Sequence, residues 1–145
     1  MATGKVGNVV FYADDPTALA AFWAAVFGVE PGIFEGPLKE RLLAAGLTEA
    51  DLATRGLVED PSGGSPRLFF QHAARPKQPG ERNRVHLDIQ ATPGRRPADE
   101  ELEAEKDRIV ALGAQVVRLI DQDWGPWHEH YYQLRDPEGN ECCLQ

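Results

Sequence analysis

The stretch Asp136-Pro137-Glu138-Gly139-Asn140 decides how the end of this chain folds. It lies between two strand-like segments, residues 127–134 and 141–145. Asp, Pro, Gly and Asn are the residues that most favour tight turns between strands. The sequence therefore predicts a hairpin that closes the C-terminal part of the fold.

The segments before this hairpin complete a βαβββ pattern. Residues 84–90 alternate strictly between polar and apolar side chains, as in a strand with one buried face. A helix is expected at about residues 97–112, because acidic residues occupy its first turn and Gly113 follows its end. Three strands then follow, at residues 115–120, 127–134 and 141–145.

The first half of the chain repeats this order. Residues 6–13 are expected to form a strand, and Asp15 is expected to cap a helix that has Pro16 at its first position and ends at Gly28. The apolar residues of this helix share one face: Leu19, Phe22, Trp23 and Val26. Three further strands are expected, near residues 29–34, near residues 56–59 and at residues 67–72.

Residues 36–55 interrupt the first half as an insertion. Two short helices joined at Gly46 are expected there, the second with a capping box formed by Thr48 and Asp51. Packing or an oligomer contact is the favoured role of the insertion, with a ligand lid as the alternative. Residues 73–81 contain prolines that neither a helix nor a central strand accepts, so they link two modules, residues 6–72 and 82–145, within one domain of residues 1–145.

Composition limits the classes of partner. The 145-residue chain is 42% hydrophobic, enough for a substantial core, and its formal net charge of −8 argues against binding to nucleic acid or to anionic membranes. No window approaches the roughly 20 apolar residues of a membrane-spanning helix. The two cysteines, Cys142 and Cys143, are neighbours that a strand points to opposite faces, so no disulfide is expected, and a cytoplasmic location is the simplest interpretation.

The repeated βαβββ pattern, Asn8 at the first strand, Phe22-Trp23 late in the first helix and the turn at residues 136–140 together resemble the vicinal oxygen chelate (VOC) superfamily. Within it, the chain is similar to glyoxalase-like proteins, and more distantly to glyoxalase I, bleomycin-resistance proteins and extradiol dioxygenases. The resemblance implies an α+β fold in which two βαβββ modules form a curved eight-stranded mixed sheet around a cleft. It leaves open whether the modules pair within one chain or across a homodimer.

The same resemblance implies positions for a metal ion. Metal-binding members of the superfamily place ligands on the first and fourth strands of each module, and these positions fall on Asn8, Gln71, His86 and Cys143. Neutral amides bind zinc, nickel or iron poorly, so only His86 and Cys143 are good ligands. A degenerate site is expected, with His86, Cys143 and Gln71 as the residues that would hold any divalent ion.

Alternation in residues 127–134 allows two arrangements of the cleft wall. If Leu134 points to the helix-covered core, four side chains face the ligand: Trp127, Glu129, Tyr131 and Gln133. Otherwise three others do so: His128, His130 and Tyr132. The first arrangement is preferred, and it makes Glu129 a candidate general base near a histidine. For the pair His128 and His130, a surface strand is the favoured interpretation, with adventitious metal binding as the alternative.

The expected ligand-binding residues combine these patterns with the resemblance: Asn8, Val10, Tyr12, Phe69, Gln71, Arg84, His86, Asp88, Trp124, Trp127, Tyr131 and Cys143. The two tryptophans are expected either to pack on the neighbouring module or to stack on an apolar ligand. Cys143 is expected to be a half-buried small hydrophobe, with a nucleophilic thiol of lowered pKa as the alternative if it faces His86.

Three functions follow for testing. The leading hypothesis is a glyoxalase-like protein that binds a small, partly apolar metabolite or antibiotic in the cleft without requiring a metal. The second is a divalent-metal-dependent enzyme of the same superfamily, a lyase, isomerase or dioxygenase. The third is a non-catalytic interaction module in which residues 36–55 contact a partner protein.

Overall fold

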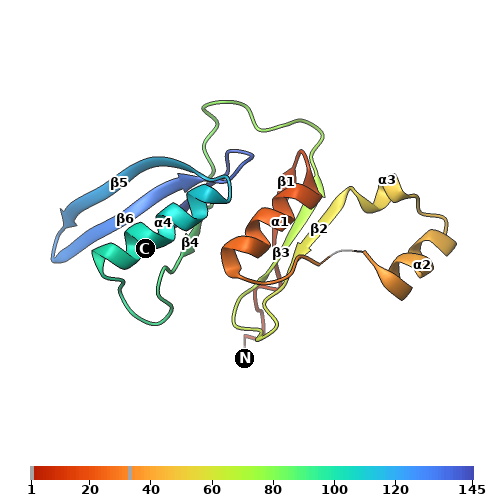
Figure 1. Cartoon of the computed structure of the whole chain (residues 1–145), viewed down its shortest axis with the longest axis horizontal. Coiled ribbons are helices and arrows are strands. Elements are labelled where there is room, and N and C mark those ends of the chain that lie inside the picture. Colours follow the sequence, from red (N-terminus) through yellow and green to blue (C-terminus); the bar gives the residue numbers. More distant parts are fainter. Residues whose placement is uncertain (1, 33) are drawn as a thin grey trace. The chain divides into compact units, whose positions relative to one another are not determined.

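The computed structural model describes residues 2–32 and 34–145 (Figure 1). The chain divides into two compact units, Met1–Pro76 and Lys77–Gln145, here called unit one and unit two. Each unit is a β-sheet with one helix packed on one face, so the fold is α+β, as the sequence predicts. None of the described helices is long and apolar enough to cross a membrane.

Unit one is built on a three-stranded sheet of order β1-β3-β2. Strand β1 (Asn8–Ala13) runs parallel to β3 (Arg67–His72), which pairs antiparallel with β2 (Arg55–Val58). Helix α1 (Pro16–Phe27) begins where the Asp15 carboxylate accepts a hydrogen bond of 3.0 Å from the Ala18 N–H. It ends at Gly28, whose φ of 66° is left-handed. Both ends are those predicted.

Aromatic packing fixes α1 on its sheet. The Phe11 ring lies 5.7 Å from the Trp23 ring and 5.2 Å from the Phe70 ring, and Trp23 and Phe70 are fully buried. At Gly56 on β2, an added Cβ would lie 2.3 Å from the carbonyl oxygen of Pro16. The backbones of helix and strand therefore approach more closely than any side chain at this position would permit.

The strand expected near residues 29–34 is reduced to an isolated bridge between Gly32 and Leu57 in the part of the segment that the structure describes; residue 33 lies outside it. Pro31 has no N–H to give to a ladder, which accounts for the short pairing. The described strands therefore number seven, in sheets of three and four, where eight were expected.

The insertion forms the two expected helices, α2 (Gly36–Ala44) and α3 (Glu49–Leu52). The capping box is present: the Thr48 hydroxyl accepts from the Asp51 N–H at 3.2 Å, and the Asp51 carboxylate accepts from the Thr48 N–H at 2.7 Å. Leu52 is the buried residue of these helices, whereas Leu38 is half exposed. Local hydrogen bonds rather than burial hold most of this segment.

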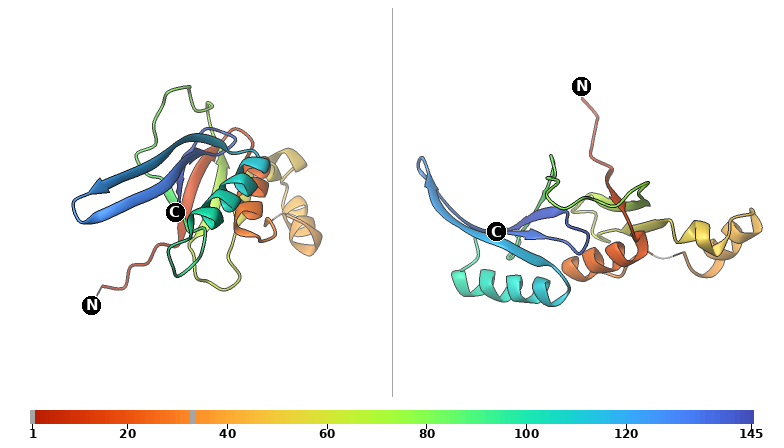
Figure 2. Two further views of the ribbon diagram at one scale, coloured as in Figure 1. Left: turned by 60° about the vertical axis from the view of Figure 1, so that its left-hand side comes forward. Right: turned by 90° about the horizontal axis from the view of Figure 1, so that it is seen from above.

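Unit two is built on a four-stranded sheet of order β4-β7-β6-β5. Its strands are β4 (Leu87–Ile89), β5 (Gln115–Trp124), β6 (Trp127–Arg135) and β7 (Glu141–Leu144). Helix α4 (Asp99–Ala111) runs along one face of this sheet (Figure 2). Strand β4 is shorter than predicted, and β5 is longer because it pairs with β6 as far as Trp124.

The turn at residues 136–140 is organised by one buried carboxylate. Asp136 is 1% exposed, and its Oδ1 accepts hydrogen bonds from the N–H groups of Glu138 (3.0 Å) and Asn140 (2.8 Å). Its Oδ2 accepts from the Asn140 side-chain amide at 2.8 Å, and Gly139 takes the left-handed φ of 84° that closes the turn. The Asp136 hydrogen bonds and the left-handed Gly139 thus form the turn that lets β6 pair with β7.

Candidate functional site

The side chains of unit two divide between two faces of its sheet. Leu134 is fully buried, and the Tyr132 hydroxyl donates a hydrogen bond to Glu103 of α4, so these two residues face the helix. Their neighbours in the alternation, Tyr131 and Gln133, face the other way, which is the first of the two arrangements considered above. We call the sheet surface turned away from α4 the open face of unit two.

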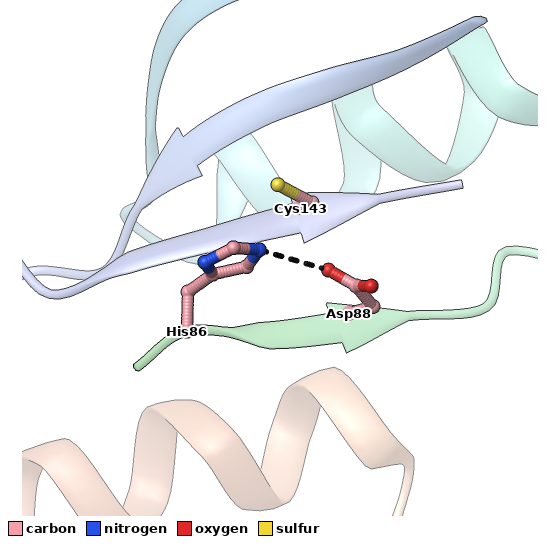
Figure 3. A group of neighbouring side chains, drawn as sticks. All are labelled: His86, Asp88 and Cys143. Carbon is pink, nitrogen blue, oxygen red and sulfur yellow. Dashed lines mark ion pairs between the residues drawn. The ribbon is translucent and has the colours of Figure 1, made fainter. Parts of the chain in front are cut away.

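Three side chains converge on the β4–β7 side of this open face: His86, Asp88 and Cys143 (Figure 3). Asp88 and Cys143 are direct partners in the parallel pairing of β4 with β7, and His86 lies just before β4. The His86 Nε2 is 3.3 Å from the Asp88 Oδ1, and the three donor atoms lie within 4.8 Å of one another. His86 and Asp88 are half exposed, whereas Cys143 is buried.

Burial and the surrounding negative charge keep the Cys143 thiol protonated. Burial, followed by the negative charges of Asp88 and Glu141, raises the pKa of Cys143 to about 11. The alternative of a nucleophilic thiolate with a lowered pKa is therefore wrong for this structure, although the thiol does lie beside His86. Cys142 points into the core, where burial raises its pKa to about 12.

A hollow of about 360 Å³ lies beside this cluster, with His86 and Cys143 in its wall. Its lining also includes three arginines: Arg82, Arg118 and Arg135. The Arg118 Nε donates a hydrogen bond of 2.8 Å to the Gln133 side chain, and Arg82 lies 3.3 Å from the Glu141 carboxylate. Arginine forks recognise carboxylate and phosphate groups, so this hollow suits an anion despite the acidic balance of the chain.

Tyr131 and Glu129 continue the open face along β6. Burial, followed by the nearby Cys143 and Glu129, raises the pKa of the Tyr131 phenol, so it remains a hydrogen-bond donor at neutral pH. Glu129 accepts a hydrogen bond of 2.8 Å from the Gln122 side chain on β5. The carboxylate in contact with His86 is Asp88, and the expected role of Glu129 as a base stays a prediction.

Trp124 and Trp127 stack on each other at the tip of the β5–β6 hairpin. Their ring centroids are 5.4 Å apart with an angle of 19° between the planes, and the two residues are 66% and 62% exposed. The sequence suggested that the two tryptophans pack on the other module or stack on a ligand. In the structure, each indole packs against the other across the hairpin.

Unit one has an open face of its own, turned away from α1. Strand pairing sets Val10 beside Phe69 and Tyr12 beside Gln71, and Asn8 shares their parity on β1. Tyr12 is 71% exposed and Val10 46%. These five residues therefore form one surface, as the alternation implied. The combination of Asn8 and Gln71 with His86 and Cys143 in one metal site stays a prediction, as does the ligand role of Arg84, which lies in a bend before β4.

Several parts of this site were missed from sequence, among them Arg82 and Arg135 in the wall of the hollow. Asp88 was expected to contact a ligand, but its position beside Cys143 depends on the register of β4 with β7. Arg118 was not expected at all, because a bulge between Val116 and Arg118 shifts the alternation of β5. Arg118 lies opposite Gln133 only after this shift, and a regular strand would have turned it to the α4 side.

Comparison with known proteins agrees with this architecture. A model of the glyoxalase-like domain matches residues 8–145, so the chain belongs to the glyoxalase-like domain family and, with it, to the VOC superfamily. A comparison with curated protein sequences finds no significant match.

Solved structures with the same fold cover nearly the whole chain. A glyoxalase/bleomycin resistance protein/dioxygenase family enzyme from Burkholderia phytofirmans PsJN is 16% identical with a TM-score of 0.57 and covers 97% of both chains. A lactoylglutathione lyase from Agrobacterium tumefaciens is 19% identical (TM-score 0.56; 99% of this chain, 93% of that one). A glyoxalase-related enzyme from Fulvimarina pelagi is 17% identical (TM-score 0.59; 98% and 87%). At these identities the likeness concerns the fold.

Proposed function

We propose that the protein binds a small, partly apolar organic acid on the open face of unit two. The observation that carries this proposal is the hollow of about 360 Å³ in which Arg82, Arg118 and Arg135 accompany His86 and Cys143. The arginines supply charge for a carboxylate, and the neutral Cys143 thiol and the neighbouring Tyr131 ring supply an apolar surface with one hydroxyl donor. Asp88 disfavours an anion directly over His86, so the acid group is expected on the Arg118 side.

Paired probes test this proposal. Benzoate and benzamide have the same shape and differ in charge, so isothermal titration with each measures the contribution of the carboxylate. We expect benzoate to bind the wild-type protein more tightly than benzamide. Arg118→Gln should weaken benzoate binding about 10-fold or more, because it removes one charged donor of a charge-assisted hydrogen bond.

The matched control is Arg41→Gln on α2, which makes the same change of charge in the insertion. Benzoate affinity should be unchanged in this variant. Equal affinity for benzoate and benzamide, or equal losses in Arg118→Gln and Arg41→Gln, would contradict the proposal.

The convergence of His86, Asp88 and Cys143 favours a second candidate, a divalent-metal-dependent enzyme. Imidazole nitrogen, carboxylate oxygen and thiolate sulfur are ligands that zinc accepts, and three protein ligands leave a fourth position for substrate or water. A metal ion bound there would act as a Lewis acid that polarises substrate oxygens. The raised pKa of Cys143 means that the ion would have to displace the thiol proton, so binding would weaken as the pH falls.

Elemental analysis of protein purified without added metal separates the two candidates. The metal-dependent enzyme requires a stoichiometric ion that Cys143→Ser and Asp88→Asn remove. Metal-free protein that still binds benzoate would favour the first candidate. The third hypothesis, an interaction module, would gain if deletion of residues 36–55 abolished the biological role while benzoate binding persisted.

A further inference from the structure

The β5–β6 hairpin carries a second group of metal-ligating side chains on the opposite side of the sheet. Cross-strand pairing sets Asp121 opposite His130 and Asp123 opposite His128. His128 and His130 have the parity of Tyr132 and Leu134, so they point to the α4 side, away from the open face. This group is therefore separate from the one formed by His86, Asp88 and Cys143.

The two imidazoles share one carboxylate. The Asp121 Oδ1 lies 3.2 Å from the His128 Nε2 and 3.8 Å from the His130 Nδ1. The rings are nearly parallel, with an angle of 12° between their planes and 6.3 Å between centroids. All three donor atoms lie within 4.8 Å of one another.

Each histidine also has a separate carboxylate on its other ring nitrogen. The Asp123 Oδ1 lies 2.9 Å from the His128 Nδ1, and the Asp99 Oδ1, at the start of α4, lies 3.7 Å from the His130 Nε2. Histidines that bind metals almost always give their second ring nitrogen to a carboxylate, a carbonyl or water, which fixes the tautomer and the ring orientation. The hairpin supplies this arrangement for His128 through Asp123, and α4 places the Asp99 carboxylate near the second nitrogen of His130.

We propose that Asp121, His128 and His130 form a binding site for a divalent cation such as Zn²⁺ or Co²⁺. In a tetrahedral site with ligands at about 2.0–2.2 Å from the metal, neighbouring ligand atoms are about 3.3–3.6 Å apart. The separations of 3.2 Å and 3.8 Å around Asp121 require shifts of only a few tenths of an ångström. The two histidine nitrogens lie within 4.8 Å of each other, so rotation of the exposed side chains has to bring them closer by up to about 1.5 Å. A cation here would bridge Asp121, His128 and His130 and so tie β5 to β6 near the hairpin tip.

The simpler alternative is a set of surface ion pairs between protonated histidines and aspartates. Exposed pairs of this kind contribute little to stability, and four of the five groups are about half exposed or more. His130 is the exception, since 17% of its side chain is accessible. Ion pairs alone predict no selective affinity for a borderline metal, so titration with metal separates the two explanations.

The experiment is isothermal titration of Zn²⁺ into tag-free protein carrying Cys143→Ser, which disables the thiol ligand of the open face. We expect one equivalent of Zn²⁺ to bind, with protons released when the same titration is made in buffers of different ionisation enthalpy. His128→Asn, His130→Asn and Asp121→Asn should each weaken this binding at least about 10-fold, and Asp123→Asn, which removes a supporting carboxylate, about 10-fold or more.

The matched control is His72→Asn on β3, because His72 is the remaining histidine outside both groups. Zn²⁺ affinity should be unchanged in this variant. Absorption of bound Co²⁺ adds a second readout: a thiolate charge-transfer band belongs to Cys143, so Co²⁺ in the hairpin site should give ligand-field bands without it.

Zn²⁺ affinities within twofold of each other in His128→Asn, His130→Asn and the Cys143→Ser parent would overturn the proposal, as would the absence of binding to that parent. Circular dichroism should show that the Asp121, Asp123, His128 and His130 variants keep the fold of the Cys143→Ser parent, because these four side chains are outside the core. If Asp121→Asn alone failed to fold, the two histidine variants would decide. Benzoate binding in the proposed function is measured on protein with an intact Cys143 and involves none of Asp121, Asp123, His128 and His130, so the two proposals can fail independently.

Discussion

Cys143 illustrates how burial and a neighbouring charge together change the chemistry of a side chain. Its thiol lies beside His86, an arrangement that favours a reactive thiolate when the imidazole is the dominant neighbour. Burial and the Asp88 carboxylate act in the opposite direction and raise its pKa. Burial is the larger of the two causes, so both effects together favour the protonated and unreactive thiol.

Asp88→Asn should lower the pKa of Cys143 but leave it above the ordinary value of 9.0, because burial, the larger cause, remains. The measurement is the pH dependence of alkylation by iodoacetamide in a Cys142→Ala background. Asp123→Asn, on the other face of the sheet, is the control and should leave the profile unchanged. A profile that does not move in Asp88→Asn would show that the carboxylate has no electrostatic influence on the thiol.

At the scale of the secondary-structure elements, close backbone contacts explain why particular residues are required. The hydrogen bonds of α1 begin at Asp15 and stop at Gly28, and Gly56 allows β2 to lie directly against the start of this helix. The first two features are visible in the sequence as capping signals. The third depends on which strand packs under the helix, and a single sequence does not contain that information.

Gly56→Ala should destabilise the protein by about 1–3 kcal/mol or more, because the new methyl group would meet the Pro16 carbonyl oxygen and Ala20. Urea denaturation followed by circular dichroism measures the change. Gly7→Ala is the matched control, since an added Cβ there has no atom within 4 Å. Similar midpoints for the two variants would contradict the close approach of α1 and β2.

The first turn of α4 should give the protein a pH-dependent contribution to stability. Hydrogen bonds from Arg95 and from the Ala98 N–H lower the pKa of Glu101 to about 2 in the folded protein. Because the folded value is depressed, the contribution is complete above the unfolded pKa of about 4.3 and is lost as the pH falls towards 2.

Glu101→Gln should therefore lower stability at pH 7 and have a smaller effect near pH 2.5. Urea midpoints of the variant and the wild type at both pH values measure this difference. Glu100→Gln, its neighbour in the same turn, is the control for loss of charge alone. A difference between Glu101→Gln and wild type that grows as the pH falls would have the wrong sign.

At the scale of the whole molecule, sequence reasoning was strongest where local signals determine structure. It predicted both long helices, the two helices of the insertion, the final hairpin and the family. It placed the end of β5 too early, because residues beyond Ile120 have no buried face and are paired through Asp–His contacts across the hairpin. It missed Arg118 because one bulge inverts the alternation, and Asp88 as a partner of Cys143 because register is a property of the sheet.

The charge of the whole chain should affect ligand binding on the open face. With a net charge of −8, the protein repels anions at long range, and the local arginines have to overcome this field. Salt screens both the long-range repulsion and the local attraction to the arginines. Because the attraction is the stronger at short distance, benzoate affinity should fall as salt rises from about 0.05 to 0.5 M. Benzamide affinity, the control, should stay constant, and a rise in benzoate affinity would indicate that repulsion dominates.

The stacked pair of Trp124 and Trp127 also has an optical consequence. Two parallel indoles at this separation couple their electronic transitions, so the far-ultraviolet spectrum should contain an exciton doublet that Trp23, buried in unit one, does not contribute. The doublet would vanish in Trp127→Phe and would fade whenever the hairpin tip opens. The intensity of this doublet should therefore report separation of β5 and β6 at the hairpin tip, without an attached dye or label.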